Sequence, residues 1–174
     1  MSVLVYAENL QGRFKKSAFE IVSFGAAIAS RMQLSLTVVS VGTVAEDELK
    51  KLARYGATKV VKVEGVAFDG GNSLPVAAAV SQVAKAEGAT VVALTASFSG
   101  KAIAPRIAVK LGAGLAENVI ELPDLSAGFR CKKNAFSGKA YDHIELISDV
   151  KVISMLPNSY KVEESPKEAA IAAF

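Results

Sequence analysis

A cluster of hydroxyl, glycine and lysine residues is the first candidate for chemistry in this chain. Residues 95–101 read TASFSGK, so Ser97, Ser99, Gly100 and Lys101 stand together between a buried strand and a helix. Ligands of open α/β sheets bind at the carboxyl ends of the strands, and hydroxyls with helix N-terminal amides can hold an anion. The segment is not a Walker A loop, because it lacks the earlier glycine and the hydroxyl residue that should follow the lysine. An ordinary N-cap by Ser97 or Ser99 is the favoured alternative.

Glu8 is the second candidate, because the loops at residues 7–9 and 41–43 should share the same edge of the sheet. It could accept a hydrogen bond from a ribose hydroxyl if a nucleotide were bound, and it is otherwise a solvated carboxylate. Universal-stress and related nucleotide-binding domains resemble this order of strands and helices, but their phosphate loops carry more glycine and hydroxyl residues than Gly100 alone provides. A stand-alone regulatory domain of that class, binding AMP or ATP, stays open as an alternative function.

Other combinations of reactive residues predict no catalysis. Asp142 and His143 are neighbours on a predicted strand, so their side chains point to opposite faces. Residues 112–114 (GAG) follow a helix and predict its C-cap and a turn. Cys131 lies within a strand, where a lone cysteine usually serves packing. With one cysteine and one histidine in the chain, neither an internal disulfide nor a histidine-based metal site is expected.

The elements that must position these residues alternate between strand and helix. Strands are predicted at residues 2–7, 36–41, 59–63 and 90–95, with helices around residues 18–29, 46–54, 76–84 and 101–111. Strands that are almost wholly apolar are typical of a parallel sheet covered on both faces. Pro105 should delay the regular start of the last helix or kink it. A polar turn is expected at residues 68–73.

From Val119 onward the hydrophobic period changes to two. Short strands are predicted at residues 129–133, 134–139, 144–148 and 151–156, with tight turns at residues 137–138 and 148–149. Because no crossover helix fits between them, they are predicted to be antiparallel. The expected fold is therefore a three-layer α/β domain, Rossmann-like or nucleotide alpha-hydrolase-like, whose parallel sheet is extended by antiparallel C-terminal hairpins.

Composition excludes several classes of protein. The chain of 174 residues suits one domain with a real core. The net charge is +3 and the basic residues are dispersed, so no basic patch indicates nucleic-acid binding. No apolar run is long enough to insert into a membrane. The start lacks the features of a signal peptide. We expect the bacterial cytoplasm, or the mitochondrial matrix for a mature eukaryotic form.

Several segments in colinear order resemble the electron transfer flavoprotein alpha-subunit. They are the opening VLVYAE and VVALTASFSGK, then GKAIAPRIAVKLGAGLAENVIEL at 100–122, FRCKKNAFSGKA at 129–140 and VKVISMLPNSY at 150–160. The resemblance covers essentially the whole chain, and it depends on the order and spacing of these segments more than on any one motif. Leu156 is a departure, because many relatives place an arginine before the Pro-Asn pair.

The resemblance implies an N-terminal alpha-subunit domain at residues 1–160, with residues 161–174 a tail or the start of a linker to an absent FAD-binding domain. This domain would be a scaffold that docks the beta-subunit, in a heterodimer that carries electrons from dehydrogenases to the respiratory chain. FAD would be bound by the following domain and AMP by the beta-subunit, so no cofactor is expected in this chain alone. The chain would be a component of an electron carrier and not an enzyme.

Three basic residues are predicted to face a partner. Arg106 follows Pro105 early in a helix, where a positive charge gains nothing from the helix dipole and a specific acceptor would explain it better. The family resemblance suggests that Arg130 and Lys139, on the hairpins, face the partner subunit or the following domain. The alternatives are a solvated Arg106, and Arg130 and Lys139 that only protect strand edges from aggregation.

Overall fold

A computed structural model describes residues 1–65, 68 and 72–174 of the chain. The expected turn at residues 68–73 therefore lies largely outside the described residues. The first half contains, in order, β1 (Ser2–Tyr6), β2 (Asn9–Leu10), β3 (Arg13–Phe14), α1 (Lys16–Met32), β4 (Ser35–Val41), α2 (Glu46–Lys50), η1 (Lys51–Arg54), β5 (Lys59–Val63), α3 (Ser73–Ala86), β6 (Ala89–Thr95) and α4 (Phe98–Leu111). The second half contains β7 (Gly114–Val119), β8 (Arg130–Ala135), η3 (Phe136–Gly138), β9 (Ala140–Glu145), β10 (Lys151–Met155) and β11 (Ala170–Ala173).

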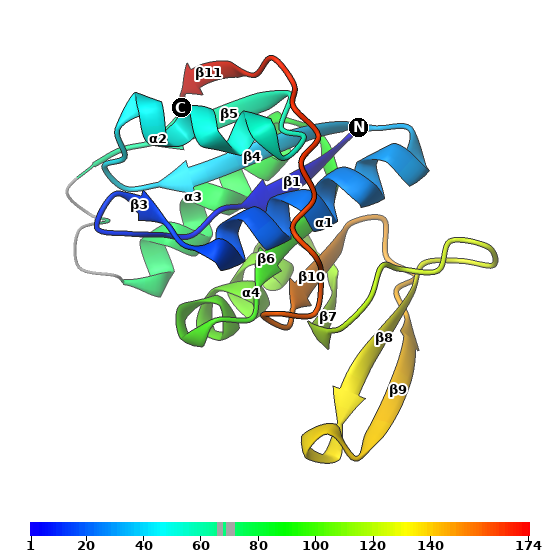
Figure 1. Cartoon of the computed structure of the whole chain (residues 1–174). Coiled ribbons are helices and arrows are strands. Elements are labelled where there is room, and N and C mark those ends of the chain that lie inside the picture. The colour runs from blue at the N-terminus through cyan, green and yellow to red at the C-terminus, as the bar shows by residue number, and fades with distance from the viewer. Residues whose placement is uncertain (66–67, 69–71) are drawn as a thin grey trace.

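The predicted three-layer α/β architecture is confirmed. Within the described residues, the main sheet has nine strands in the order β11-β5-β4-β1-β6-β10-β7-β8-β9 (Figure 1). The central strand β1 is buried along its whole length and pairs in parallel with β4 and β6. A strand that is apolar on both faces needs cover on both faces, and helices supply it on each side.

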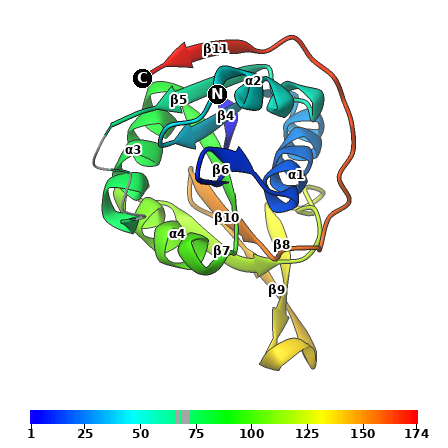
Figure 2. The same cartoon turned by 60° about the vertical axis from the view of Figure 1, so that its left-hand side comes forward.

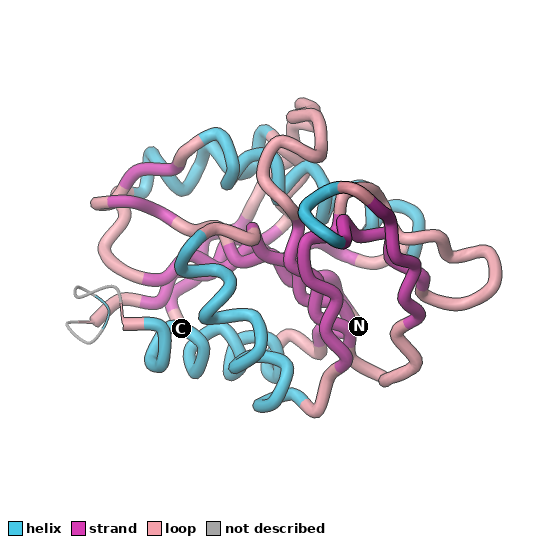
Figure 3. The backbone as a smooth tube through the Cα atoms, turned by 90° about the horizontal axis from the view of Figure 1, so that it is seen from below, coloured by secondary structure: helices cyan, strands magenta, loops and turns pink. Residues whose placement is uncertain are grey.

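The two faces of the sheet are covered by different helices. One core gathers around Phe24, Ile21 and Ile28 of α1, and the other around α3 and α4 with side chains such as Val80 and Ile107. Figure 2 shows α3 and α4 next to each other and α1 across the sheet from them, and Figure 3 shows the strands between the helices. The sheet is thus buried between the two layers, and its ends remain available for ligands.

The prediction that the last strands are all antiparallel is wrong for β10. This strand lies between β6 and β7 and runs parallel to both. Its residues 152–155 are fully buried, as suits a central position with neighbours on both sides. The pairs β7–β8 and β8–β9 are antiparallel, as expected. The local alternation of KVISM is that of any short strand, and it does not encode which neighbour the strand takes.

The hairpin formed by β8 and β9 projects from the far edge of the sheet (Figures 1 and 2). Its turn at Phe136–Gly138 contains the expected residues Ser137 and Gly138. The strand boundaries differ from those predicted, since β8 runs on to Ala135 and β9 already ends at Glu145. The outer strand β9 has no neighbour on its other side among the described residues. The hairpin therefore presents a free strand edge.

Residues 161–174, expected to be a tail or the start of a linker, lie against the domain. The hydroxyl of Ser23 in α1 donates to the carbonyl of Glu163 and accepts from its amide, both at 3.1 Å. Tyr160 packs edge-to-face on Phe24 with ring centroids 5.5 Å apart. The chain then crosses to the opposite edge of the sheet, where β11 pairs in parallel with β5 (Figure 1). We call residues 160–174 the C-terminal strap.

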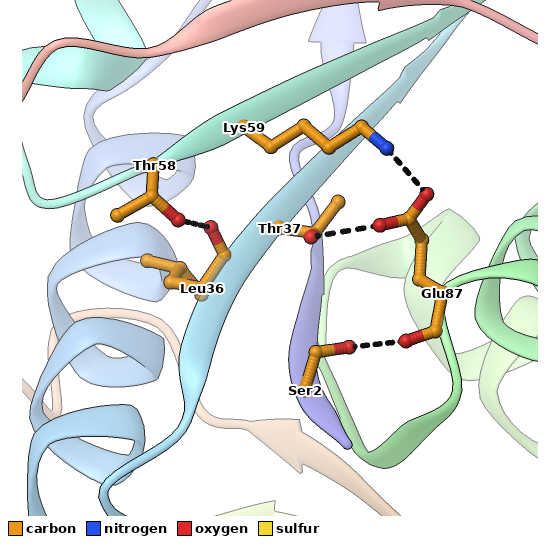
Figure 4. Close-up of polar contacts among 6 residues, drawn as sticks. All are labelled: Ser2, Leu36, Thr37, Thr58, Lys59 and Glu87. Carbon is orange, nitrogen blue, oxygen red and sulfur yellow. Dashed lines mark hydrogen bonds and ion pairs between the residues drawn. The ribbon is translucent and has the colours of Figure 1, made fainter.

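A polar network closes the amino edge of the sheet, away from the candidate site. Glu87, just after α3, accepts from Lys59 at 2.7 Å and from Thr37 at 3.4 Å, and its carbonyl accepts from Ser2 at 3.0 Å (Figure 4). These contacts tie the starts of β1, β4 and β5 to the end of α3. All of its groups satisfy one another, so this network is structural.

Among the helices described, none is long and apolar enough to cross a bilayer.

Candidate functional site

The carboxyl ends of β1 and β6 bring the sequence-predicted residues Glu8, Ser97 and Ser99 together. The two strands pair in parallel with Tyr6 beside Leu94, so the residues that follow them leave the sheet at the same edge. Ser97 donates to a carboxylate oxygen of Glu8 at 2.7 Å, and Ser99 donates to the other oxygen. The hydroxyl of Ser97 also accepts from the amide of Gly100 at 2.9 Å. Ser97 is thus the N-cap of α4, as the favoured alternative predicted.

The start of α4 already holds a carboxylate of the protein itself. The carboxylate of Glu8 is bound to the two hydroxyls that an external anion would need. An anion bound beside it would be repelled by its negative charge. Helix α4 begins at Phe98 and runs through Pro105 without interruption, so the expected delay of its start does not occur. This arrangement disfavours a phosphate at Ser97 and Ser99.

Gly100 and Lys101 play other parts than phosphate binding in this geometry. A Cβ atom on Gly100 would lie 1.9 Å from the carbonyl oxygen of Thr95, so glycine is required there for the close approach of α4 to the end of β6. Lys101 is exposed and makes no ion pair among the described residues. The Gly-Lys pair is therefore explained by packing at Gly100 and solvation at Lys101.

The loops at residues 7–9 and 41–43, expected at this edge, form a second wall of the site together with the β2–β3 turn, which was not predicted. The side-chain nitrogen of Asn9 donates to the backbone carbonyl of Val41 at 2.8 Å, and the side-chain oxygen of Asn9 accepts from the backbone N–H of Gly12 at 3.2 Å. Gly12 has a φ of 76° and packs closely against the carbonyl of Thr43. These contacts close the β2–β3 turn onto the end of β4. The Asn and Gly spacing of a turn was the only signal for it.

Between these walls lies a cavity of about 620 Å³. Its lining includes the polar residues Glu8, Asn9, Gln11, Thr43 and Ser99 and the apolar residues Val41, Val76 and Ile103. Tyr6, which is 6% exposed, also lines this cavity. Burial raises the pKa of Tyr6, and the nearby Glu8 raises it further. Tyr6 was not predicted, because its position in an apolar strand indicates packing.

The residues considered for catalysis or metal binding do not form a reactive group. Cys131 is buried, and burial raises the pKa of its thiol to about 12, which suits a packing role. His143 and Asp142 are exposed on β9, and Asp142 lies 3.7 Å from Lys133. No cluster of three metal-ligating side chains occurs among the described residues.

The three basic residues predicted to face a partner do not lie together. Arg106 is exposed on α4, where it donates to the carbonyl of Ala102 one turn earlier. Arg130 lies on the hairpin and is 3.3 Å from Glu145. Lys139 is exposed just after the hairpin turn. Two of the three therefore share the hairpin, and Arg106 belongs to a different surface.

The parallel sheet between two helical layers, with polar residues gathered at its carboxyl edge, defines a Rossmann-like three-layer α/β protein. The chain belongs to the electron transfer flavoprotein domain family, whose model matches residues 3–174. The resemblance found in the sequence is confirmed by this match over nearly the whole chain.

Curated relatives carry the same family name. An electron transfer flavoprotein subunit alpha from Mycobacterium leprae is 27% identical over 96% of this chain and 50% of the relative. One from Thermoanaerobacterium thermosaccharolyticum is 29% identical over 65% of this chain and 34% of the relative. Protein FixB from Clostridium saccharobutylicum is 26% identical, again over 65% of this chain and 34% of the relative. The chain spans half or less of the length of these relatives.

Proposed function

We propose that this chain is the scaffold and partner-docking domain of an electron transfer flavoprotein alpha-subunit. In this proposal, residues 1–160 form the body of the N-terminal domain, and the C-terminal strap, which adds β11 to its sheet, leads toward an FAD-binding domain. The intact heterodimer, with its beta-subunit, carries electrons from dehydrogenases to the respiratory chain through FAD. The observation that carries the proposal is the family match over residues 3–174, in a chain that spans half or less of its relatives.

The proposed division of labour gives the redox chemistry to FAD. The described residues offer no cluster of metal ligands, and the single cysteine is buried. In a flavoprotein, groups around the flavin ring tune its electronics. The cavity at the carboxyl edge of the sheet contains the carboxylate of Glu8, whose negative charge disfavours the pyrophosphate of FAD. FAD is therefore assigned to the following domain. This chain acts as a component of an electron carrier and not as an enzyme, in the bacterial cytoplasm or the mitochondrial matrix.

The proposed docking surface for the beta-subunit is the β8–β9 hairpin. Phe136 at its turn is 82% exposed and Tyr141 on its outer strand is 61% exposed. Aromatic residues and arginine are enriched in protein interfaces. Lys139 lies next to the turn that holds Phe136, and Arg130 lies at the other end of the hairpin. Arg106 on α4 is assigned to a second contact, with the partner or the following domain.

Co-purification with a beta-subunit tests this function. The 174-residue chain should capture a tagged beta-subunit, and the double substitution F136S/Y141S should weaken capture by at least about tenfold, because interface aromatics often contribute 2 kcal/mol or more each. Lys139→Glu should also weaken it. Lys85→Glu, on the exposed surface of α3, is the matched charge control and should bind normally. Normal capture by all hairpin variants would move the docking surface elsewhere, and no capture by the wild-type chain would refute the docking role.

A further inference from the structure

Helix α4 carries an apolar stripe on the side that faces away from the sheet. Its inner side is buried through residues such as Ile103 and Ile107, which belong to the core of this layer. At about 3.6 residues per turn, apolar residues recur at every third or fourth position on the opposite side, where a surface helix normally carries polar ones. We call these residues the outer stripe, and they are Phe98, Ala102, Pro105 and Val109.

The two ends of the outer stripe are open to solvent. Phe98 is 99% exposed and Val109 is 84% exposed, so no described part of the chain covers them. Figure 2 shows α4 at the outside of the molecule. Apolar residues that are exposed singly are common, but these follow one another along a single helix face, which indicates a contact surface.

The outer stripe also contains a hollow. A surface cavity of about 420 Å³ is lined by Pro105, Arg106, Val109 and Lys110, and its walls are almost entirely apolar. The guanidinium of Arg106 donates to the carbonyl of Ala102 one turn earlier, so its aliphatic stem lies along the helix as one wall. Such a hollow receives an apolar side chain of a partner better than it fits a flat surface.

Three positive charges flank the outer stripe, and α4 contains no acidic residue. By helical spacing, Lys101 lies on one side of the stripe and Arg106 and Lys110 on the other. None of the three makes an ion pair with any residue that the structure describes. By contrast, Lys50 of α2 pairs with Glu46 at 3.0 Å. The charges of α4 are therefore available to an acidic partner.

Charge and shape together select the occupant. A second copy of this chain would bring the same three positive charges to the contact, and like charges across an interface are unfavourable. An anionic lipid surface would suit the charge, but it needs a broad apolar face that enters the bilayer interface. The outer stripe is narrow and is hollowed at Pro105. A helix with apolar residues on one face and acidic flanks satisfies both the charge and the hollow.

We propose that the outer stripe of α4 docks an acidic amphipathic helix of a partner protein. The apolar residues of that helix pack on Phe98 and Val109 and enter the hollow at Pro105, and its carboxylates pair with Arg106 and Lys110. The stripe is about 16 Å long, which matches about three turns of a partner helix. This inference deepens the second contact proposed for Arg106 and rests on that part of the proposed function alone, because it does not involve the hairpin.

Binding of matched helical peptides to the 174-residue chain tests the proposal. The probe is a peptide of about 18 residues, long enough to form a helix, with leucine along one face and glutamate on both flanks. One matched peptide has lysine in place of every glutamate, and another has serine in place of every leucine. In isothermal titration at low ionic strength, the leucine–glutamate peptide should bind at least about tenfold more tightly than either matched peptide.

Two results of these titrations would overturn the proposal. One is the absence of binding by the leucine–glutamate peptide at millimolar concentration, or an affinity no greater than that of the lysine peptide. The other is binding of the chain to phosphatidylglycerol vesicles without binding of the leucine–glutamate peptide, which would identify α4 as a lipid-binding helix.

Substitutions locate the binding on α4. Val109→Gln should weaken binding of the leucine–glutamate peptide at least about tenfold, because it places a polar group at the hollow. The double substitution R106E/K110E should reverse the preference, so that the lysine peptide binds more tightly. Lys85→Glu, at an exposed position of α3, is the control and should bind as the wild type does. Circular dichroism checks that each variant is folded, and an unchanged preference in a folded R106E/K110E chain would contradict the assignment.

The hairpin variant F136S/Y141S separates this inference from docking by the hairpin. It should bind the leucine–glutamate peptide as the wild type does, although its capture of the beta-subunit should be weakened. Loss of peptide binding in this variant, if it is folded, would place the peptide site on the hairpin and overturn the assignment to α4.

Discussion

At the scale of single residues, close packing explains why residue 100 is glycine, although the sequence suggested Gly100 as part of an anion-binding site. Its missing side chain leaves room for the carbonyl of Thr95, which a Cβ atom would approach to 1.9 Å. Such an overlap with backbone cannot be relieved by a rotamer change. The residue therefore fixes how α4 begins, and through Ser97 it also fixes where Glu8 is held.

Replacing Gly100 by alanine should destabilise the protein by about 2–4 kcal/mol, because α4 must shift away from β6. The midpoint of urea unfolding measures this effect. Lys101→Ala, at the next and exposed position, removes a side chain without any such contact and should change stability by less than about 0.5 kcal/mol. A Gly100→Ala chain as stable as the wild type would mean that the helix start is more adaptable than its geometry indicates.

Cys131 makes stability depend on alkaline pH. Burial raises the pKa of its thiol from 9.0 to about 12, so the folded state disfavours the thiolate. The resulting stabilisation is complete below pH 9 and is lost as the pH rises from about 9 to about 12, because the unfolded chain ionises first. The free energy of unfolding of the wild type should therefore fall relative to that of Cys131→Ala between pH 8 and pH 10.5. A difference between the two chains that does not change with pH would contradict this linkage.

The candidate site was predictable only in part, for reasons that lie in its residues. Glu8, Ser97 and Ser99 follow strands that were recognisable as parallel, so their meeting at one edge could be expected. Their mutual hydrogen bonds could not, because side-chain direction after a strand depends on loop geometry. Tyr6 has the sequence context of a core residue, and its place beside the cavity is visible only in the folded structure.

At the scale of elements, the C-terminal strap is part of the fold. It contributes β11 to the sheet and satisfies the buried hydroxyl of Ser23. The sequence predicts a tail or the start of a linker at residues 161–174, because AIAA, rich in alanine, has a weak preference for strand. Its pairing comes from the unoccupied edge of β5, which is tertiary information. The same limit applies to β10, whose alternation was recognised and whose direction was not.

Deleting residues 161–174 should destabilise the domain by several kcal/mol, on the order of 2–5, since it removes a strand and leaves Ser23 in α1 without its partners. Hydrogen exchange should show that the amides of β5 lose protection while those of β6 keep it. The single substitution Ser23→Ala removes only the hydrogen bonds to Glu163 and should lower the free energy of unfolding by about 1–2 kcal/mol. Unchanged protection of β5 after the deletion would show that β11 adds nothing to that edge.

At the scale of the whole molecule, the sheet is completed by a strand from late in the chain. β10 lies between β6 and β7. Its Val152 packs in one core, and its Ile153 and Met155 pack in the other. A fragment of residues 1–128 should therefore lack a cooperative thermal transition, although it contains β1, β4, β5, β6 and every described helix longer than one turn. Calorimetry beside the full chain checks this. A sharp transition of the fragment would show that the first half is an independent folding unit.

The position of β10 also has a consequence for synthesis in the cell. Until the ribosome has released residues up to Met155, β6 and β7 cannot obtain their common neighbour, and their edges and the apolar side chains around them stay uncovered. Exposed edges and unfinished cores invite association with other nascent chains. The yield of folded protein should accordingly depend on how quickly the last third of the message is translated and on chaperones that hold the unfinished chain.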